Sequence, residues 1–331
     1  MPRHLLAFAA LAGCLWLAPS FARADAPASQ KPAFDHVYVI VLENHDFDDA
    51  FSAERTPFLE RLAREQGLAT QYYGVAHPSL PNYLALIGGD VFGVADDAPS
   101  CFASDLTPVQ PCHHIEGDSL VDQLETAGLT FAAYFQSLPE AGGLRQGIPG
   151  PGTLALYAQK HNPFAYYDAI AKNPARLARL KPFEALAGDL KGQAASFVFI
   201  VPDQCHDGHG LPQCSDEAQL QQDYDAFVAS AIELIRASKN FTERSAIVVT
   251  FDEGESQHKT EAAAETDNRI PTVVVTKSGH AKTTAARLDH YALLATIEDG
   301  FGLSRLRNAA GAPTLGALFP RLRSAPGEAA K

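Results

Sequence analysis

Cysteine, methionine and tryptophan are scarce in this chain of 331 residues, which contains five Cys, one Met and one Trp. Positive charge is also in short supply, because 26 Lys and Arg face 39 Asp and Glu and the formal net charge is −13. An acidic chain lacks the clustered cations that hold a phosphate backbone, which argues against nucleic-acid binding. The overall composition, 46% hydrophobic and 20% charged, excludes disordered and collagen-like chains.

The first 24 residues have the pattern of a secretory signal peptide. A short basic start precedes a mostly apolar stretch over residues 5–19, which is too short to span a bilayer, and small residues follow it. We predict cleavage after Ala24, a flexible leader over residues 25–33, and a secreted or periplasmic protein. A lipoprotein anchored through Cys14 is the less favoured alternative, because the apolar stretch continues past that residue. Since no later segment approaches 18 apolar residues, no stable membrane anchor is expected.

Four cysteines are left after this cleavage, and export places them where disulfides are permitted. Of the three ways to pair them, the spacing favours Cys101 with Cys112 and Cys205 with Cys214, each closing a short loop. A zinc site is the alternative, because histidines adjoin Cys112 and Cys205. In an exported chain, we favour the disulfides.

Continuous apolar runs, mostly rich in β-branched or aromatic residues, predict buried parallel strands. They cover residues 37–42, 131–135, 196–201, 246–251 and 271–275. Helical patterns cover residues 56–66, 119–126, 215–238 and 288–301. This alternation predicts an α/β fold with a largely parallel central sheet and helices on both faces. Residues 34–331 are expected to form one domain, with a helical or irregular insertion at about 139–192 that caps the edge or mouth of the sheet.

Polar side chains follow four of the predicted strands. The segments are Glu43-Asn44, Asp203 to His209, Asp252-Glu253 and Lys277 to His280. Sites in open parallel sheets form outside the carboxyl ends of the strands, so we expect all four segments at one rim. Crowded carboxylates repel one another unless they are protonated or bind a cation. The cluster therefore predicts a divalent metal ion, with oxygen donors suiting Ca²⁺, Mg²⁺ or Mn²⁺ and imidazole adding Zn²⁺.

A candidate nucleophile lies in another segment, His77-Pro78-Ser79-Leu80-Pro81-Asn82. Ser79 stands at the predicted N-cap of a helix, with Pro81 in the first turn, where its missing N–H costs nothing. The simplest interpretation is that Ser79 only caps the helix. However, the N-terminus of a helix also binds phosphate through its free N–H groups. A serine placed there beside a metal ion is a plausible nucleophile.

These motifs together resemble the phosphoesterase family, which contains acid phosphatases and phosphatidylcholine-type phospholipases C and is similar in fold to the alkaline phosphatase superfamily. The matching segments, in the order of the family, are Glu43-Asn44-x-x-Phe47-Asp48, Ser79-Leu80-Pro81-Asn82, Pro202 to His209, Asp252-Glu253-Gly254 and Asp289-His290-Tyr291. The resemblance covers about residues 34–303. It weakens after Gly254, where Glu255 to His258 lacks the Asp-His pair of plant phospholipases.

The resemblance also implies a role for each matching residue. The implied metal ligands are Glu43, Asn44, Asp252 and Glu253. Ser79 takes the position of the nucleophile, where phospholipase members typically carry Thr. The implied substrate-binding residues are Asn44, Asn82, His77 and Asp207. His209 or His290 would protonate the leaving oxygen. His206 and His280 are weaker candidates for helpers, whereas His113, His114 and His161 are expected to be ordinary surface histidines.

An exported, metal-dependent phosphatase is therefore expected, hydrolysing small phosphate monoesters through a phosphoserine and needing no obligate protein partner. Few Lys or Arg flank the motifs, so the positive potential is expected from the metal ion, protonated imidazoles and a helix N-terminus. A phospholipase C acting on lipid headgroup esters is the first alternative, which the lack of a conspicuous apolar or basic membrane-docking segment disfavours. The second alternative, an exported metal- or anion-binding protein without catalysis, would not need Ser79.

Overall fold

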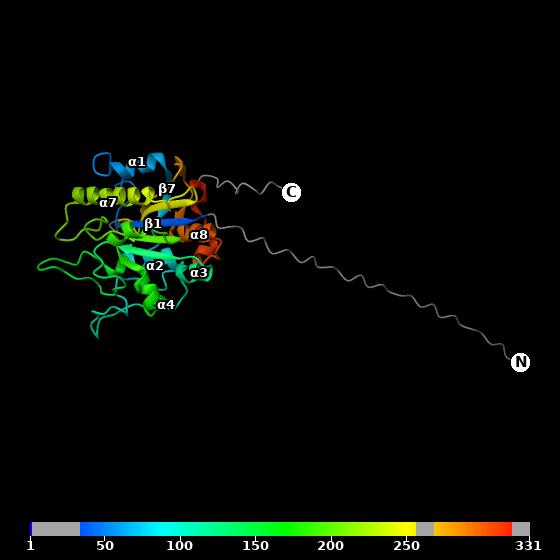
Figure 1. Cartoon of the computed structure of the whole chain (residues 1–331), viewed down its shortest axis with the longest axis horizontal. Helices are drawn as coiled ribbons and strands as arrows, with labels where there is room; N and C mark the ends of the chain where they lie inside the picture. Colours follow the sequence, from blue (N-terminus) through cyan, green and yellow to red (C-terminus); the bar gives the residue numbers. More distant parts are fainter. Residues whose placement is uncertain (2–33, 256–267, 320–331) are drawn as a thin grey trace. The chain divides into compact units, whose positions relative to one another are not determined.

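The computed structural model describes residue 1 and residues 34–255 and 268–319 (Figure 1). The predicted signal peptide, the leader, the lipoprotein cysteine Cys14 and the segment Ser256 to His258 lie outside the described residues. Both predicted disulfides, Cys101–Cys112 and Cys205–Cys214, are present, so these four sulfurs do not form a zinc site. Among the described residues, no helix is long and apolar enough to cross a membrane.

The centre of the described chain is a nine-stranded sheet with the order β4-β3-β5-β1-β6-β7-β2-β8, in which β9 also pairs with β2. The strands are β1 (His36–Leu42), β2 (Gly67–Tyr73), β3 (Phe131–Phe135), β4 (Leu180–Pro182), β5 (Phe197–Val201), β6 (Ser245–Phe251), β7 (Arg269–Thr276), β8 (Lys282–Thr284) and β9 (Leu288–Asp289). Every residue of β3, β5 and β6 is buried. Because alternate residues of a strand point to opposite faces, the sheet is covered on both sides.

Helices and 3₁₀ turns supply this cover. The helices are α1 (Pro57–Glu65), α2 (Ser79–Gly88), α3 (Leu120–Thr126), α4 (Asp168–Ala171), α5 (Pro174–Leu177), α6 (Leu186–Asp189), α7 (Glu217–Ala237) and α8 (His290–Phe301). The 3₁₀ turns are η1 (Gln159–His161), η2 (Pro163–Ala165), η3 (Phe183–Ala185), η4 (Arg307–Gly311) and η5 (Leu315–Leu318). Helix α1 packs on α7, and α2 packs on α8. The expected α/β architecture is confirmed.

Strand β7 corrects the prediction that all the apolar runs form parallel strands. It runs antiparallel to both of its neighbours, β6 and β2. A continuous apolar run reports burial on both faces of a sheet and carries no information about direction, which explains the error. Consequently, the segment from Lys277 to His280 follows β7 at the end of the sheet opposite to the end where Leu42 and Phe251 lie. The expectation that it joins the other polar segments at one rim was wrong.

Strand β2 was not predicted, yet it sets the position of the Ser79 segment. Its pattern is broken by the polar residues Thr70 and Gln71, so no continuous apolar run marks it. Because β7 is antiparallel to both β6 and β2, β2 runs in the direction of β1 and β6 and ends at their rim. The chain then enters α2. Ser79 is the first residue of this helix and Pro78 is its N-cap, so the predicted cap lies one residue too late.

The insertion at about 139–192 contributes short helices and the edge strand β4. Two loops, one at residues 104–111 before the insertion and one at residues 146–156 within it, carry large exposed apolar side chains, and we call them the apolar loops. The exposed side chains are Val109, Ile148, Leu154 and Leu156. Sequence analysis found no conspicuous apolar or basic membrane-docking segment, and each of these loops contributes only a few such side chains. The fold brings the loops together, since Gln110 Nε2 donates to Gln146 Oε1 over 3.1 Å.

Candidate active site

Three parallel strands deliver acidic side chains to one rim of the sheet. Glu43 directly follows β1, Asp252 directly follows β6, and Asp207 lies a few residues beyond the end of β5. The Glu43 backbone N–H donates to the Asp207 carbonyl over 2.8 Å, and the Asp252 N–H donates to the Leu42 carbonyl over 2.9 Å. All three carboxylic side chains are fully buried. The backbone ladder therefore fixes these groups close together, where water does not screen their charges.

Ser79 faces this acidic group from the start of α2. Its hydroxyl oxygen lies 3.1 Å from Glu43 Oε2 and 3.4 Å from Glu253 Oε1. The side chain is 1% exposed, so it is held by these partners and not by bulk water. His77 Nδ1 lies 2.5 Å from Glu253 Oε2. The predicted nucleophile and two of the predicted metal ligands are thus in direct contact.

Asn82 and Asn44 have different local partners. Asn82 Oδ1 accepts from the backbone N–H groups of Val75 and Ala76 over 2.8 and 3.0 Å, which holds the loop between β2 and α2. Its Nδ2 lies 3.5 Å from Glu253 Oε2. The backbone N–H of Asn44 donates to Asp252 Oδ1 over 3.3 Å, while the residue itself has a left-handed backbone with φ 53°. These contacts give Asn82 a clear role in shaping the Ser79 segment.

His161 was expected on the surface, and this prediction was wrong. The side chain is 2% exposed and lies between two acids, with Nε2 3.2 Å from Glu43 Oε1 and Nδ1 3.4 Å from Asp207 Oδ2. Its ring stacks on that of Tyr83, whose hydroxyl donates to Glu43 Oε1 over 2.6 Å. Because His161 belongs to a 3₁₀ turn of the irregular insertion, no strand or motif pattern in the sequence marks it.

Lys160 supplies a cation that sequence analysis missed. Its Nζ lies 2.9 Å from Asp97 Oδ2, 3.3 Å from His209 Nε2 and 3.5 Å from Ser79 Oγ. The other oxygen of Asp97 accepts from the Leu80 backbone N–H in the first turn of α2. The positive potential was expected from the metal ion, protonated imidazoles and a helix N-terminus. That set omitted Lys160, which lies 81 residues from Ser79 in the sequence and so does not flank its motif.

The other histidines separate into site and non-site groups. His209 donates from Nδ1 to the Gly210 carbonyl over 2.9 Å, so its Nε2 faces Lys160. His290 is fully buried, with Nε2 2.5 Å from the Asp252 carbonyl and Nδ1 3.2 Å from the Tyr72 hydroxyl. Both nitrogens of His290 are thus engaged, Nε2 with Asp252 and Nδ1 with Tyr72. Three other histidines pair with separate acids, namely His206 with Asp203, His113 with Asp96 and His114 with Asp168.

Burial dominates the electrostatics of the site. Burial, followed by the effect of nearby acids, raises the pKa of Asp252 and of Asp207 well above the usual range. Burial likewise raises the pKa of Glu43 to about 8. Burial and then the charge of Lys160 lower the pKa of His161 and His209. For Lys160, burial lowers the pKa, but the charges of Glu43 and Asp97 outweigh it and the net pKa is raised.

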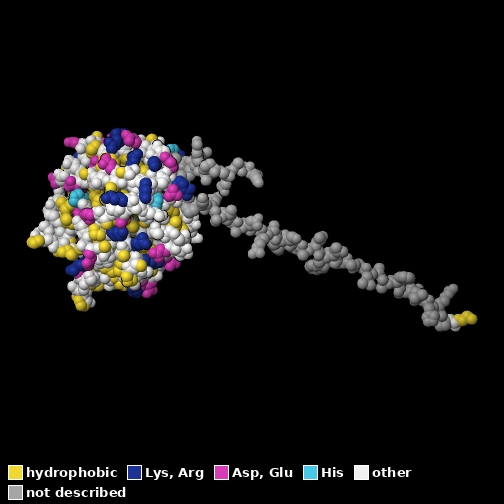
Figure 2. All heavy atoms as spheres, in the orientation of Figure 1, with side chains coloured by type: hydrophobic (Ala, Val, Ile, Leu, Met, Phe, Trp, Pro, Cys, Tyr) yellow, Lys and Arg dark blue, Asp and Glu magenta, His cyan; other side chains and the backbone are white. Residues whose placement is uncertain are grey.

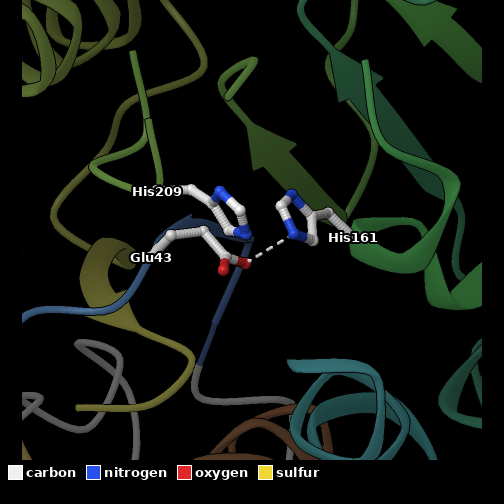
Figure 3. A group of neighbouring side chains, drawn as sticks. All are labelled: Glu43, His161 and His209. Carbon is white, nitrogen blue, oxygen red and sulfur yellow. Dashed lines mark ion pairs between the residues drawn. The ribbon is translucent and has the colours of Figure 1, made fainter. Parts of the chain in front are cut away.

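The donor groups fit a bound cation. In Figure 3, His161 and His209 point toward Glu43, and one ligand atom from each lies within 4.8 Å of the others. Within the described part of the chain, the buried oxygens Asn44 Oδ1 and Asp252 Oδ2 have no hydrogen-bond partner. Unpaired buried oxygens are costly, and a cation would satisfy them. Glu43 therefore belongs both to the predicted set of oxygen ligands and to the group drawn in Figure 3. The two sets of donors lie next to each other.

An open cavity of about 500 Å³ leads to this group. Asn44, His209 and Glu253 belong to its lining. The lining also carries the acids Asp46, Asp49, Glu217 and Glu255 and one arginine, Arg55. A ligand of moderate size could therefore reach the neighbourhood of Ser79.

Solved structures with this fold define the class to which the architecture belongs. A protein in the alkaline phosphatase superfamily from Vibrio parahaemolyticus superposes with a TM-score of 0.53 at 14% identity, covering 86% of this chain and 71% of that one. The phosphonate monoester hydrolase from Silicibacter pomeroyi gives a TM-score of 0.52 at 15% identity, covering 89% and 78%. The chain therefore shares the fold of the alkaline phosphatase superfamily.

Sequence comparison narrows this class to a family. The model of the phosphoesterase family matches residues 49–304, and the chain belongs to that family. It is 30% identical to a probable acid phosphatase of Kluyveromyces lactis over 83% of this chain, and spans 60% of the length of that relative. It is 28% identical to a phosphatidylinositol-3-phosphatase of Mycobacterium tuberculosis, covering 87% of this chain and 84% of the relative.

Proposed function

We propose that this protein is an exported phosphatase that hydrolyses phosphate monoesters through a phosphoserine formed on Ser79. The observation that carries the proposal is the contact of the Ser79 hydroxyl with Glu43, Glu253 and Lys160, at the carboxyl ends of the strands. Membership of the phosphoesterase family and the acid phosphatases among its relatives support the same reaction. The disulfides support export to an oxidising compartment.

A divalent metal ion fits this site. Glu43, Asn44, Asp252 and Glu253 would hold it, and it would lower the proton affinity of the serine hydroxyl and offset the charge of the phosphate. Imidazole nitrogen from His161 and His209 is available beside these oxygens. We infer that the buried acids are kept ionised by this cation, since burial alone favours their protonated forms.

The reaction then proceeds in two displacements. Ser79 Oγ attacks phosphorus opposite the ester oxygen, its proton passes to a contacting carboxylate, and the ester P–O bond breaks. His209 is neutral, so its Nε2 first accepts a proton from the Lys160 ammonium, 3.3 Å away, and then passes this proton to the leaving oxygen. Water attacks the phosphoserine, the P–Oγ bond breaks, Ser79 regains a proton and inorganic phosphate leaves. We assign His290 to holding Asp252 and not to proton transfer, because both of its nitrogens are engaged.

A substrate panel tests the monoesterase proposal against phospholipase C action. We expect kcat/KM for p-nitrophenyl phosphate to exceed that for bis(p-nitrophenyl) phosphate by about 100-fold, because a diester places a second alcohol where the site offers charged groups. Phosphatidylcholine vesicles are the third substrate. Hydrolysis confined to these vesicles would favour phospholipase C, and no turnover of any substrate would favour a non-catalytic binding protein.

Replacing Lys160 is expected to weaken phosphate binding and transition-state stabilisation. Lys160→Met should lower kcat/KM for a soluble monoester by about 100-fold, the size typical for loss of one donor to a developing anion. Lys160→Arg should recover most of this loss, because the charge is retained. Lys172→Met is the matched control, since Lys172 pairs with Asp168 at the surface. Equal activities of the Met variants at positions 160 and 172 would exclude this role.

A further inference from the structure

The apolar loops carry the large exposed apolar side chains of the described domain. Val109 is 93% exposed, Ile148 and Leu154 are each 54% exposed, and Leu156 is 37% exposed. Figure 1 shows green and teal loops extending from the left side of the molecule, where α7 begins, and Figure 2 shows hydrophobic side chains at projecting points of that side. Exposed apolar residues scattered singly are ordinary, but this set is confined to two adjoining loops.

Hydrogen bonds and a disulfide hold the loops at fixed positions. The disulfide Cys101–Cys112 closes the base of the first loop. The Gln146 backbone N–H donates to Asp105 Oδ1 over 3.0 Å, and its side chain accepts from Gln110. The exposed side chains are therefore presented together on anchored loops.

The apolar loops adjoin the candidate active site. A cavity of about 240 Å³ has Leu154 and Ala155 in its lining together with Asp97 and Lys160. Lys160 Nζ in turn lies 3.5 Å from Ser79 Oγ. A surface that received the loops would therefore lie close to the catalytic serine.

The charge pattern determines which kind of surface fits. No Asp, Glu, Lys or Arg lies between residues 106 and 112 or between residues 146 and 159, and the whole chain has a net charge of −13. Anionic membranes attract clusters of Lys and Arg, which the loops lack. Transfer of an uncharged apolar tip from water into an apolar environment lowers the free energy, and it does not require a surface of complementary shape. A zwitterionic lipid surface matches both properties.

A protein partner or a second copy of the chain fits less well. Four side chains of this size offer roughly 400 Å² of apolar surface, about half of the ~800 Å² that each partner buries in a standard interface. The loops also present projecting tips and not a flat face. A lipid–water interface accepts such tips individually, because lipid chains move to accommodate them.

We propose that the apolar loops insert into a zwitterionic lipid–water interface and hold the active site against it, so that monoesters carried by lipids are substrates. The docking itself does not depend on the phosphatase activity, whereas the lipid substrate class rests on the proposed function. The loops dock at the surface and do not span the bilayer.

Flotation with phosphatidylcholine vesicles tests the docking. The protein is purified after export, with its N-terminus read by mass spectrometry, and compared with Val109→Ser/Ile148→Ser and with the matched apolar variant Val109→Leu/Ile148→Leu. We expect wild type and the Leu variant to float with the vesicles, and the Ser variant to partition at least about tenfold less. Binding should persist in about 1 M NaCl, because it does not depend on charge.

Activity measurements separate docking from catalysis. The Ser variant should hydrolyse p-nitrophenyl phosphate at the wild-type rate within about twofold, since neither changed residue lines the site. It should hydrolyse phosphatidic acid in phosphatidylcholine vesicles about tenfold more slowly than wild type does, in line with its weaker partition. If wild type bound the vesicles but did not hydrolyse p-nitrophenyl phosphate, the proposed function would be refuted and the docking proposal would stand.

Three results would overturn the docking. The first is equal partition of wild type and the Ser variant. The second is binding confined to anionic vesicles and abolished in about 1 M NaCl, which would indicate an electrostatic contact. The third is a wild-type dimer by light scattering that the Ser variant loses, without vesicle binding by either, which would assign the loops to self-association.

Discussion

Replacing Ser79 with alanine is expected to lower kcat/KM for p-nitrophenyl phosphate by about 10⁴-fold, because the variant lacks the oxygen that would form the covalent intermediate. The hydroxyl contacts only a few groups, and alanine fits its space, so the folded structure should persist. The measurement is steady-state kinetics on metal-loaded protein, together with the melting temperature of each variant.

A covalent intermediate gives this prediction a second readout. Acid quenching of wild type during turnover of a ³²P-labelled monoester should leave label on the protein, and the alanine variant should carry none. Ser79→Thr retains a hydroxyl and is the matched control, expected to keep measurable turnover and labelling. If the alanine variant kept more than about a tenth of the wild-type rate, Ser79 would not be the nucleophile.

Removing divalent cations is expected to lower activity by about 10³-fold, because the cation would both activate the serine and offset the charge of the phosphate. Activity should return when one of Ca²⁺, Mg²⁺, Mn²⁺ or Zn²⁺ is added to the stripped protein. The measurement pairs the activity assay with elemental analysis before and after stripping. Full activity in protein shown to be free of metal would refute metal dependence.

The pH dependence of the melting temperature should also reveal whether the cation is bound. In the stripped protein, burial raises the pKa of Glu43 from 4.5 to about 8, so the folded state binds this proton more tightly than the unfolded state does. The stabilisation is complete below the unfolded value of 4.5 and is lost as the pH rises through about 8. The melting temperature of the stripped protein should therefore fall by about 5 °C between about pH 6 and about pH 9. Bound cation should remove this dependence, because it keeps the acid ionised.

The elements that were predicted well have a strong local signal. The runs that became β1, β3, β5 and β6 are continuous and apolar, and both their positions and the polar residues that follow them match the structure. The long helix α7 also begins after an acidic cap, Asp216, whose side chain accepts from the Gln219 N–H. The sequence patterns that indicate a buried strand or a helix cap span only a few residues, so the sequence alone predicts these features.

The residues that were missed have no such signal. Lys160 and His161 lie in an irregular insertion, and only the packing of its 3₁₀ turn against Tyr83 brings them to the acids. Strand direction also escapes a local pattern, because burial on both faces is the same for a parallel and an antiparallel strand. His280 was therefore placed at the wrong end of the sheet.

By itself, the sequence determined the fold class, the positions of most of the main strands along the chain, the two disulfides and the acidic segments after β1, β5 and β6. Those features depend on hydrophobic periodicity, short spacings and the rule that parallel strands end at one rim. The tertiary structure alone decided that Lys160 contacts Ser79, that His161 is buried, and that Val109 and Ile148 are presented on adjoining loops. Each of these contacts joins segments far apart in the chain, and their proximity is a property of packing that no local pattern carries.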